Sequence, residues 1–484
     1  MTDFLHYRSN STPNLPALLD TSTNKLLNFS ELNNEVDKFS LALLQEGIKP
    51  GDRVGLVLDT SASSVVTIHS MLRIGAICIP LFNKSSPDEL SIFIKIANIG
   101  RIFFQKSPLI DHLDLGIPIT HFNTISQTSI TKFNPVLYKK NMNDTCFLFF
   151  TSGTSSPFPK AVQTTYANLI YSAMASSLRL NNDNKDIWSL YLPLNHMGGI
   201  SPIFRSLVCG NMVASMDSPS PKQLQSSLKQ HKITCISLIP TLLNKIIDLQ
   251  IDLSSLRFIL LGGDAAPKNL ISKCQELGLH VYPTYGATEV TSQIATATPK
   301  DALENPGTVG RALPLLNISI VGDSGHKLSD GSPGEIVVSG PMVHRGYYGE
   351  QEVFDTLPTR TNIFHTGDIG YLKNDFLWVV GRKNNKIITG GENVYPLEVE
   401  NILHSHPGIQ DVAVFGEIDV HWGEKVIAVA VKNDSFLSEE ILLTFCKKKI
   451  AGYKIPKSIY FVDSIPRTVS GTFNRSKFDL NDVI

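Results

Sequence analysis

Short apolar runs that alternate with segments of helical spacing are the feature that most constrains the fold of this chain. Residues 54–58 read as a buried strand, residues 65–72 have helical spacing, and residues 76–79 read as a second strand. Similar apolar runs return at residues 146–150, 188–192, 233–238 and 258–261. Two strands joined by a helix form a βαβ unit, so the repetition predicts a layered α/β fold with ligand sites in the loops after the strands.

The pattern of apolar, turn-forming and charged residues changes twice further along the chain. From Asn317 onward, short strands alternate with turns, which predicts a β-rich subdomain. A basic polar stretch begins at Arg382 and precedes about 100 residues of mixed pattern. We therefore predict a large N-terminal layered α/β domain at residues 1–381 and a small, mobile C-terminal α+β domain at residues 382–484.

Charge and cysteine content exclude several classes of protein. The chain has 43 Lys and Arg against 44 Asp and Glu, without a basic block, so we expect no nucleic-acid partner. No window approaches the roughly 18 apolar residues needed to span a bilayer, so we expect no stable membrane insertion. The six cysteines lie far apart without a CxxC pair and read as buried thiols, which favours a cytoplasmic location.

The sharpest local motif is FFTSGTSSPFPKAV, where a predicted strand runs into a loop rich in hydroxyl groups that ends at a lysine. Hydroxyl groups, a glycine and one positive charge suit phosphate oxygens. The motif residues are Thr151, Ser152, Gly153, Thr154 and Lys160. The P-loop pattern GxxxxGK[ST] is absent, and a Ser/Thr-rich surface turn is the alternative interpretation of the motif by itself.

Further motifs follow in order: FILLGGDAAP, VYPTYGATEVTSQ, HTGDIGYL, VVGRKNNKIITGGENVYPLEVE and YKIPKSIYFVDSIPRTVSG. With this ordered set the chain resembles the adenylate-forming superfamily of acyl-CoA synthetases, luciferases and peptide-synthetase adenylation domains. The resemblance implies an ATP-dependent acid-thiol ligase that forms an acyl-CoA through an acyl-adenylate. It implies ATP, Mg²⁺ and coenzyme A as cofactor and co-substrates, a small-molecule carboxylic acid as substrate, and a homodimer as the default assembly.

The resemblance also assigns roles to residues. Those implied to bind the nucleotide are the loop residues above together with Gly262, Gly263, Asp264, Tyr285, Gly286, Thr288, Asp368 and Arg382. Glu289 is implied to hold Mg²⁺, and Lys160, Thr288, Glu289 and His196 are implied to be catalytic. Gly390, Gly391, Glu392 and Asn393 match the face that admits the pantetheine arm of coenzyme A. Taken singly, Asp368 could be a turn residue and Arg382 a solvated surface charge.

The acid pocket follows from a second segment, PLNHMGG, in which His196 lies after a predicted strand. Nine residues further on, Arg205 is predicted at the start of a helix, where a guanidinium would fit a second carboxylate. In these segments the sequence most resembles the o-succinylbenzoate-CoA ligase family of menaquinone and phylloquinone biosynthesis. That resemblance places Ser292 and Gln293 beside the pocket and implies o-succinylbenzoate as substrate, with another aryl- or fatty acyl-CoA synthetase as the alternative.

Two positions depart from the superfamily pattern. The phosphate loop is one residue longer than usual and lacks its second glycine. Thr472 stands where the superfamily almost always has the lysine that contacts carboxylate and α-phosphate, and Lys454, Lys457 or Lys477 are the candidate substitutes. The alternative function is therefore an adenylation-impaired protein that binds ATP or an adenylate.

Overall fold

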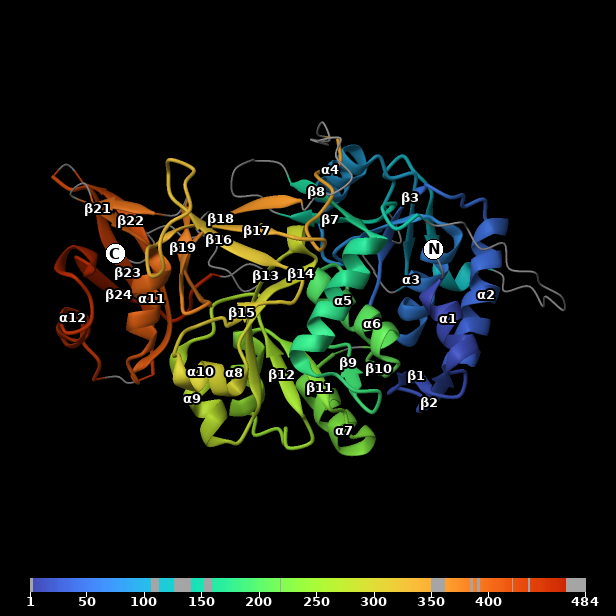
Figure 1. Ribbon diagram of the computed structural model, residues 1–484, viewed down its shortest axis with the longest axis horizontal. Coiled ribbons are helices and arrows are strands. Elements are labelled where there is room, and N and C mark those ends of the chain that lie inside the picture. Colours follow the sequence, from blue (N-terminus) through green and yellow to red (C-terminus); the bar gives the residue numbers. More distant parts are fainter. Residues whose placement is uncertain are drawn as a thin grey trace.

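The computed structural model (Figure 1) describes most of the chain, and every statement about structure below concerns the described part. The described residues are 3–105, 113–125, 141–151, 159–217, 219–349, 362–383, 386–389, 392–419, 421–433 and 436–466.

A six-stranded sheet lies in the N-terminal part, with the strand order β6-β5-β3-β4-β7-β8. Its strands are β3 (Arg53–Val57), β4 (Ile77–Pro80), β5 (Arg101–Phe104), β6 (Ile119–His121), β7 (Thr145–Thr151) and β8 (Lys160–Thr165). The helices near it are α1 (Phe4–Ser11), α2 (Phe29–Gln45), α3 (Ala62–Ile74) and α4 (Pro87–Ala97). Strands β3 and β4 pair in parallel across α3, which confirms the predicted βαβ unit.

A nine-stranded sheet has the order β15-β14-β13-β12-β11-β9-β10-β1-β2. Its strands are β1 (Pro16–Asp20), β2 (Lys25–Asn28), β9 (Ile187–Ser189), β10 (Met212–Ser215), β11 (Cys235–Leu238), β12 (Phe258–Leu261), β13 (Val281–Ala287), β14 (Ser292–Thr296) and β15 (Arg311–Ala312). The associated helices are α5 (Tyr166–Leu180), α6 (Met197–Cys209), α7 (Pro221–His231), α8 (Pro240–Asp248), α9 (Lys268–Glu276) and α10 (Pro299–Glu304). The pairs from β1 through β12 to β13 are parallel, as the buried apolar runs predict.

Two smaller sheets complete the described structure. The four-stranded sheet contains β16 (Asn317–Val321), β17 (Gly334–Ser339), β18 (Ile363–Lys373) and β19 (Phe376–Arg382), in this order. The five-stranded sheet contains β20 (Ile387–Thr389), β21 (Glu392–Val394), β22 (Ile409–Asp419), β23 (Gly423–Lys432) and β24 (Ser458–Phe461), with α11 (Pro396–His404) and α12 (Glu439–Lys447). This last sheet forms the body at the left of Figure 1, next to β19. The predicted division between residues 381 and 382 falls at the end of β19 and stays a prediction.

Local capping chemistry explains where several helices begin. Asn28 accepts a hydrogen bond from the Glu31 amide, and the Glu31 carboxylate accepts one from the Asn28 amide, so the predicted capping box at the start of α2 is confirmed. The same reciprocal pair between Thr165 and Asn168 begins α5. These caps satisfy amide groups that the first turn of a helix leaves without partners.

The largest apolar cluster joins both large sheets through helices that lie between them. Its buried residues come from β1, β3 and β7 and from helices α2, α3, α5 and α6. Figure 1 shows α5 and α6 side by side at the centre of the molecule. Helix α6 is therefore buried along most of its length, from Met197 to Leu207.

Two expectations about chemistry and location can be compared with the structure. Five of the six cysteines are buried and Cys209 is partly exposed, and none of the six forms a disulfide in the described part of the chain. No helix among the described residues is long and apolar enough to cross a membrane.

Arg73 is a buried charge that ties α1 and α2 to α3. Its guanidinium contacts Asp37 at 2.8 Å and Asp3 at 3.2 Å, and its side chain is 3% exposed. We predict that Arg73→Ala lowers the free energy of unfolding by about 3 kcal/mol, because it removes the buried cation that two partly buried carboxylates share. Urea unfolding followed by circular dichroism measures this. The control is Lys38→Ala, which removes an exposed pair with Glu35 and should change stability by less than about 1 kcal/mol. Equal effects of the two substitutions would contradict the prediction.

Candidate active site

Strands β12, β13 and β14 bring together the residues expected along a nucleotide base. Gly262 and Gly263 directly follow β12, which pairs in parallel with β13, and Tyr285 and Gly286 lie on β13 itself. Gly286 has to be a glycine, because an added Cβ atom would lie 1.8 Å from the Ser292 carbonyl oxygen on the paired strand β14. The close approach of the two strands therefore accounts for this glycine.

Tyr285 and Arg382 both contact the Asp368 carboxylate. Asp368 and Arg382 are register partners on β18 and β19, and Arg382 Nε lies 2.9 Å from Asp368 Oδ1. The Tyr285 hydroxyl donates a hydrogen bond of 2.6 Å to Asp368 Oδ2. Burial raises the pKa of the Asp368 carboxyl, while the Arg382 charge and the Tyr285 hydrogen bond oppose that shift. The structure thus brings Tyr285 into contact with Asp368, which lies 83 positions further along the chain and pairs with Arg382 across a hairpin.

The phosphate side of the site is described in part. Thr151 ends β7 and is the register partner of Lys160, the first residue of β8, so the loop between them closes a β-hairpin. Ser152, Gly153 and Thr154 lie outside the described residues. Asp264 accepts a hydrogen bond of 2.7 Å from the amide of Ala265, the next residue in the loop after β12.

A side chain that the sequence did not single out connects Lys160 with Glu289. The hydroxyl of Tyr347 donates a hydrogen bond of 3.1 Å to Glu289 Oε1, and Lys160 Nζ lies 4.5 Å from the centre of the Tyr347 ring. Thr288 and Glu289 form a short 3₁₀ turn directly after β13. The only sequence signal for Tyr347 is its place in the segment SGPMVHRGYY, and no spacing rule connects that segment with Glu289.

His196 lies at the amino end of α6, as the N-cap residue. It contacts the solvent, yet the surrounding protein desolvates the imidazole and lowers its pKa, so the ring is neutral near pH 7. The side-chain amide nitrogen of Asn195 lies 3.2 Å from His196 Nε2. Gly199 allows the preceding loop to pack tightly, because an added Cβ atom would lie 2.1 Å from the Pro193 carbonyl oxygen.

Arg205 lies in the third turn of α6, and the prediction that it begins a helix was wrong. The helix begins directly after His196 and continues through Pro202, a residue type that usually interrupts a helix. The Arg205 side chain is buried, with its residue 1% exposed. Nη2 donates a hydrogen bond of 2.9 Å to Gln293 Oε1, and the guanidinium carbon lies 5.0 Å from the Trp188 ring centre. Burial lowers the pKa of Arg205 to about 10, so the group stays charged near neutral pH.

The second terminal nitrogen of Arg205, Nη1, has no hydrogen-bond partner among the described residues. Arg205 lines a small hollow together with Leu169, Ser172, Ala173, Ser201, Phe204 and Thr291. Hydroxyl groups and a charged nitrogen without a partner suit an anionic or polar group. Ser292 begins β14 beside Thr291, and both residues have positive φ angles.

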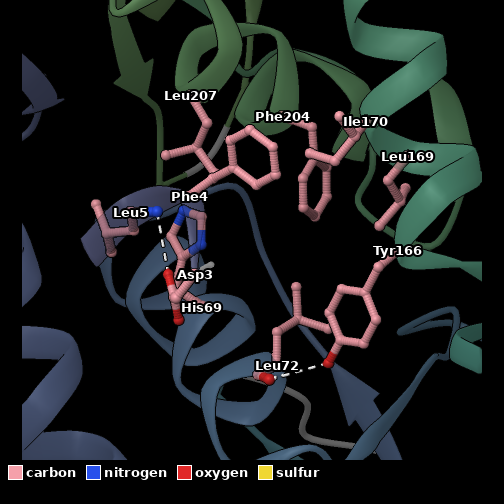
Figure 2. A pocket seen from close by; sticks show the side chains of 10 residues that line it. All are labelled: Asp3, Phe4, Leu5, His69, Leu72, Tyr166, Leu169, Ile170, Phe204 and Leu207. Atoms are coloured by element: carbon pink, nitrogen blue, oxygen red, sulfur yellow. Dashed lines mark hydrogen bonds between the residues drawn. The ribbon is translucent and has the colours of Figure 1, made fainter. Parts of the chain in front are cut away.

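A larger, mostly apolar hollow lies on the other side of Phe204 (Figure 2). Figure 2 shows Phe204, Leu169 and Ile170 facing Phe4, Leu5 and His69 across this space. Phe204 and Leu169 line both hollows, so these two side chains lie between them.

The residues expected to contact coenzyme A are described only in part. Glu392 begins β21 and is the register partner of Thr389, and Asn393 follows it on the same strand. Gly390, Gly391, Thr472 and Lys477 lie outside the described residues. Lys454 is bound by Glu398 at 2.6 and 2.8 Å. Lys457 lies over the Trp422 ring at 4.5 Å.

Comparison with known proteins gives consistent matches along the chain. The AMP-binding enzyme family matches residues 5–348, and the AMP-binding enzyme C-terminal domain matches residues 398–472. A 2-succinylbenzoate–CoA ligase from Bacillus licheniformis is 34% identical in an alignment 483 residues long, which covers 98% of this chain and 98% of the relative.

Solved structures agree with these matches. The o-succinylbenzoate CoA synthetase of Bacillus subtilis in complex with its acyl-adenylate intermediate superimposes with a TM-score of 0.88 at 30% identity, covering 99% of this chain and 98% of that one. The same enzyme in complex with ATP and a magnesium ion gives a TM-score of 0.87 at 30% identity and covers 99% of both chains. The chain belongs to the AMP-binding enzyme family, and within it to the family of 2-succinylbenzoate–CoA ligases.

Proposed function

We propose that this chain is an AMP-forming ligase that activates 2-succinylbenzoate with ATP and transfers the acyl group to coenzyme A. The observation that carries the proposal is the buried, charged Arg205, whose Nη1 is unpartnered within the described structure and lines a polar hollow. Gln293 connects Arg205 with the nucleotide residues, because its Nε2 donates to Thr296 Oγ1 at 2.8 Å and Thr296 contacts the Thr284 hydroxyl at 2.8 Å. Thr284 directly precedes Tyr285 on β13.

The nucleotide is held by the residues on β13, β18 and β19. Asp368 has oxygen lone pairs left after its contacts with Tyr285 and Arg382, and these accept hydrogen bonds from the ribose hydroxyls. The backbone at Gly262 and Gly263 lies along the base, where the absence of side chains permits close approach. Lys160 and Thr288 act on the phosphates, with Thr151 at the start of the same hairpin loop.

Glu289 is the candidate metal ligand. No three His, Cys, Asp or Glu side chains gather as a metal site in the part of the chain that the structure describes. A single carboxylate fits Mg²⁺, which keeps several waters and takes further oxygen ligands from substrate phosphates. When bound, Mg²⁺ neutralises charge on the phosphates and so makes pyrophosphate a better leaving group.

The reaction proceeds in two steps. In the first, a carboxylate oxygen of the acid attacks the α-phosphorus of ATP, and the bond to pyrophosphate breaks. In the second, the thiolate of coenzyme A attacks the acyl carbon, and AMP leaves with the electron pair of the broken C–O bond. Arg205 binds the second carboxylate of the acid, His196 lines the pocket as a neutral ring, and Ser292 and Gln293 complete it. Residues 390–393 admit the thiol.

Two further properties are inferred from the sequence and from relatives in general. Homodimer formation is our default expectation for the assembly. A cytoplasmic location is our expectation for the enzyme. Size-exclusion chromatography with light scattering and fractionation of cells test these two expectations.

The proposal is tested by ATP–pyrophosphate exchange with 2-succinylbenzoate, benzoate or a medium-chain fatty acid as the acid. We expect exchange with 2-succinylbenzoate in the native protein. Exchange that occurs only in Thr472→Lys would favour the adenylation-impaired alternative, because that lysine stabilises the transition state of the first step. Exchange with benzoate or the fatty acid, and none with 2-succinylbenzoate, would contradict the substrate assignment.

A second prediction concerns Arg205. Arg205→Met keeps an unbranched side chain but removes the charge and the donors, so we expect the KM for 2-succinylbenzoate to rise roughly 10- to 100-fold. The KM for ATP should change by less than about threefold, because Arg205 contacts the nucleotide residues only through Gln293. Steady-state kinetics with each substrate varied in turn measures both constants. Arg205→Lys is the matched variant that retains the charge, and equal changes in both KM values would contradict the role.

A further inference from the structure

Tyr347 lies between the two charged side chains that act on phosphate and metal in the proposed function. Its hydroxyl donates to the Glu289 carboxylate, and its ring faces the Lys160 ammonium group. We propose that Tyr347 is a positioning residue that aims the Glu289 carboxylate and keeps it apart from Lys160, so that both remain available to Mg-ATP. This inference rests on the proposed roles of Glu289 and Lys160.

The backbone holds Tyr347 in this place from the side of β8. The Gln163 amide donates to the Gly346 carbonyl at 3.0 Å, and the Arg345 amide donates to the Gln163 carbonyl at 3.1 Å. The Tyr348 amide donates to the Ala161 carbonyl at 2.8 Å. Val162 and Tyr347 are partners in an antiparallel bridge. The segment 345–348 therefore pairs with the strand whose first residue is Lys160.

The same segment is attached to Glu289 from its other end. The His344 amide donates a hydrogen bond of 2.7 Å to the Glu289 carbonyl. The His344 ring packs against the Tyr347 ring with a centroid distance of 4.9 Å, and it contacts Phe364 at 5.6 Å. Residues 344–348 thus bridge the strand that carries Lys160 and the turn that carries Glu289, and we call them the bridging segment.

The two polar functions of Tyr347 are separable. The hydroxyl restricts rotation of the Glu289 carboxylate by its hydrogen bond to Oε1, so that the lone pairs of Oε2 can serve a ligand. The ring attracts the Lys160 ammonium group by a cation–π contact, which offers the lysine a position other than the carboxylate. Without the ring, the opposite charges can approach and form a direct ion pair. Such a pair would compete with Mg²⁺ for Glu289.

Substitutions that separate these functions test the proposal. Tyr347→Phe removes only the hydroxyl, and we expect the half-saturating Mg²⁺ concentration to rise about 10-fold, the lower end of effects seen when the partners of metal ligands are removed. Tyr347→Leu removes the ring as well and should raise it further. Tyr348→Phe is the matched control, because Tyr348 lies next in the chain but packs with Arg53 and the cluster around β5.

A double substitution should change the half-saturating Mg²⁺ concentration in the opposite direction from the single Tyr347 substitutions. In the Tyr347→Leu protein, adding Lys160→Met removes the competing ammonium group, so the Mg²⁺ requirement should fall. In the native protein, Lys160→Met should not lower the Mg²⁺ requirement, because the ring already holds the ammonium group by a cation–π contact. A purely structural role of Tyr347 does not predict this reversal.

The measurements are Mg²⁺ titrations of ATP–pyrophosphate exchange and calorimetric titrations of ATP binding with and without Mg²⁺, together with Tm. We expect the Phe variant to lose affinity for Mg-ATP but to bind free ATP as the native protein does. Glu289→Gln is the reference that removes the charge of the metal ligand.

Three results would overturn the inference. The first is an unchanged Mg²⁺ requirement in both Tyr347 variants while Glu289→Gln raises it, which leaves the proposed function intact. The second is an unchanged requirement in Glu289→Gln as well, which removes the metal assignment on which the inference rests. The third is a lowered Tm in Tyr347→Phe with KM values for acid, ATP and Mg²⁺ that shift together, which would assign Tyr347 a structural role.

Discussion

The burial of helix α6 between the two large sheets is the constraint on which the site depends. Its apolar residues belong to the cluster that joins both sheets, so the helix cannot shift without disturbing that packing. His196 caps its amino end, and Arg205 projects from its third turn. At its carboxyl end, Arg8 of α1 donates to the Leu207 and Val208 carbonyl oxygens, with the first bond at 2.8 Å. One rigid element therefore sets the positions of both residues that we propose to bind the acid.

Charge compensation differs between the two ends of the site. At the nucleotide end, the Asp368 carboxylate is balanced by Arg382 and hydrogen-bonded by Tyr285. At the acid end, the described partners of Arg205 are the neutral Gln293 and the Trp188 ring. A buried charge is unfavourable unless it is paired, so the second carboxylate of the acid would supply the missing opposite charge. The proposed dicarboxylate substrate fits this charge balance.

Much of the fold was accessible from sequence because its signals are local. The Asn28 capping box and the strand at residues 258–261 depend on neighbours in the chain, and the structure confirms both. The nucleotide motifs could be recognised because loops that approach phosphates and bases need particular residue types. Their members Tyr285, Asp368 and Arg382 lie together as expected, while the phosphate-loop residues 152–154 lie outside the described part.

Sequence by itself determined the alternation of strands and helices, the order of the motifs and the family, because propensity, periodicity and motif spacing are properties of short segments. Tertiary structure decided that Arg205 lies inside a helix rather than at its start, since packing against both sheets accommodates Pro202 within α6. It also decided that Tyr347 contacts Glu289 and Lys160, which lie 58 residues and nearly 190 residues away in the chain. Such contacts arise when the pairing of β8 with the bridging segment brings distant residues together, and no local pattern in the sequence records that pairing.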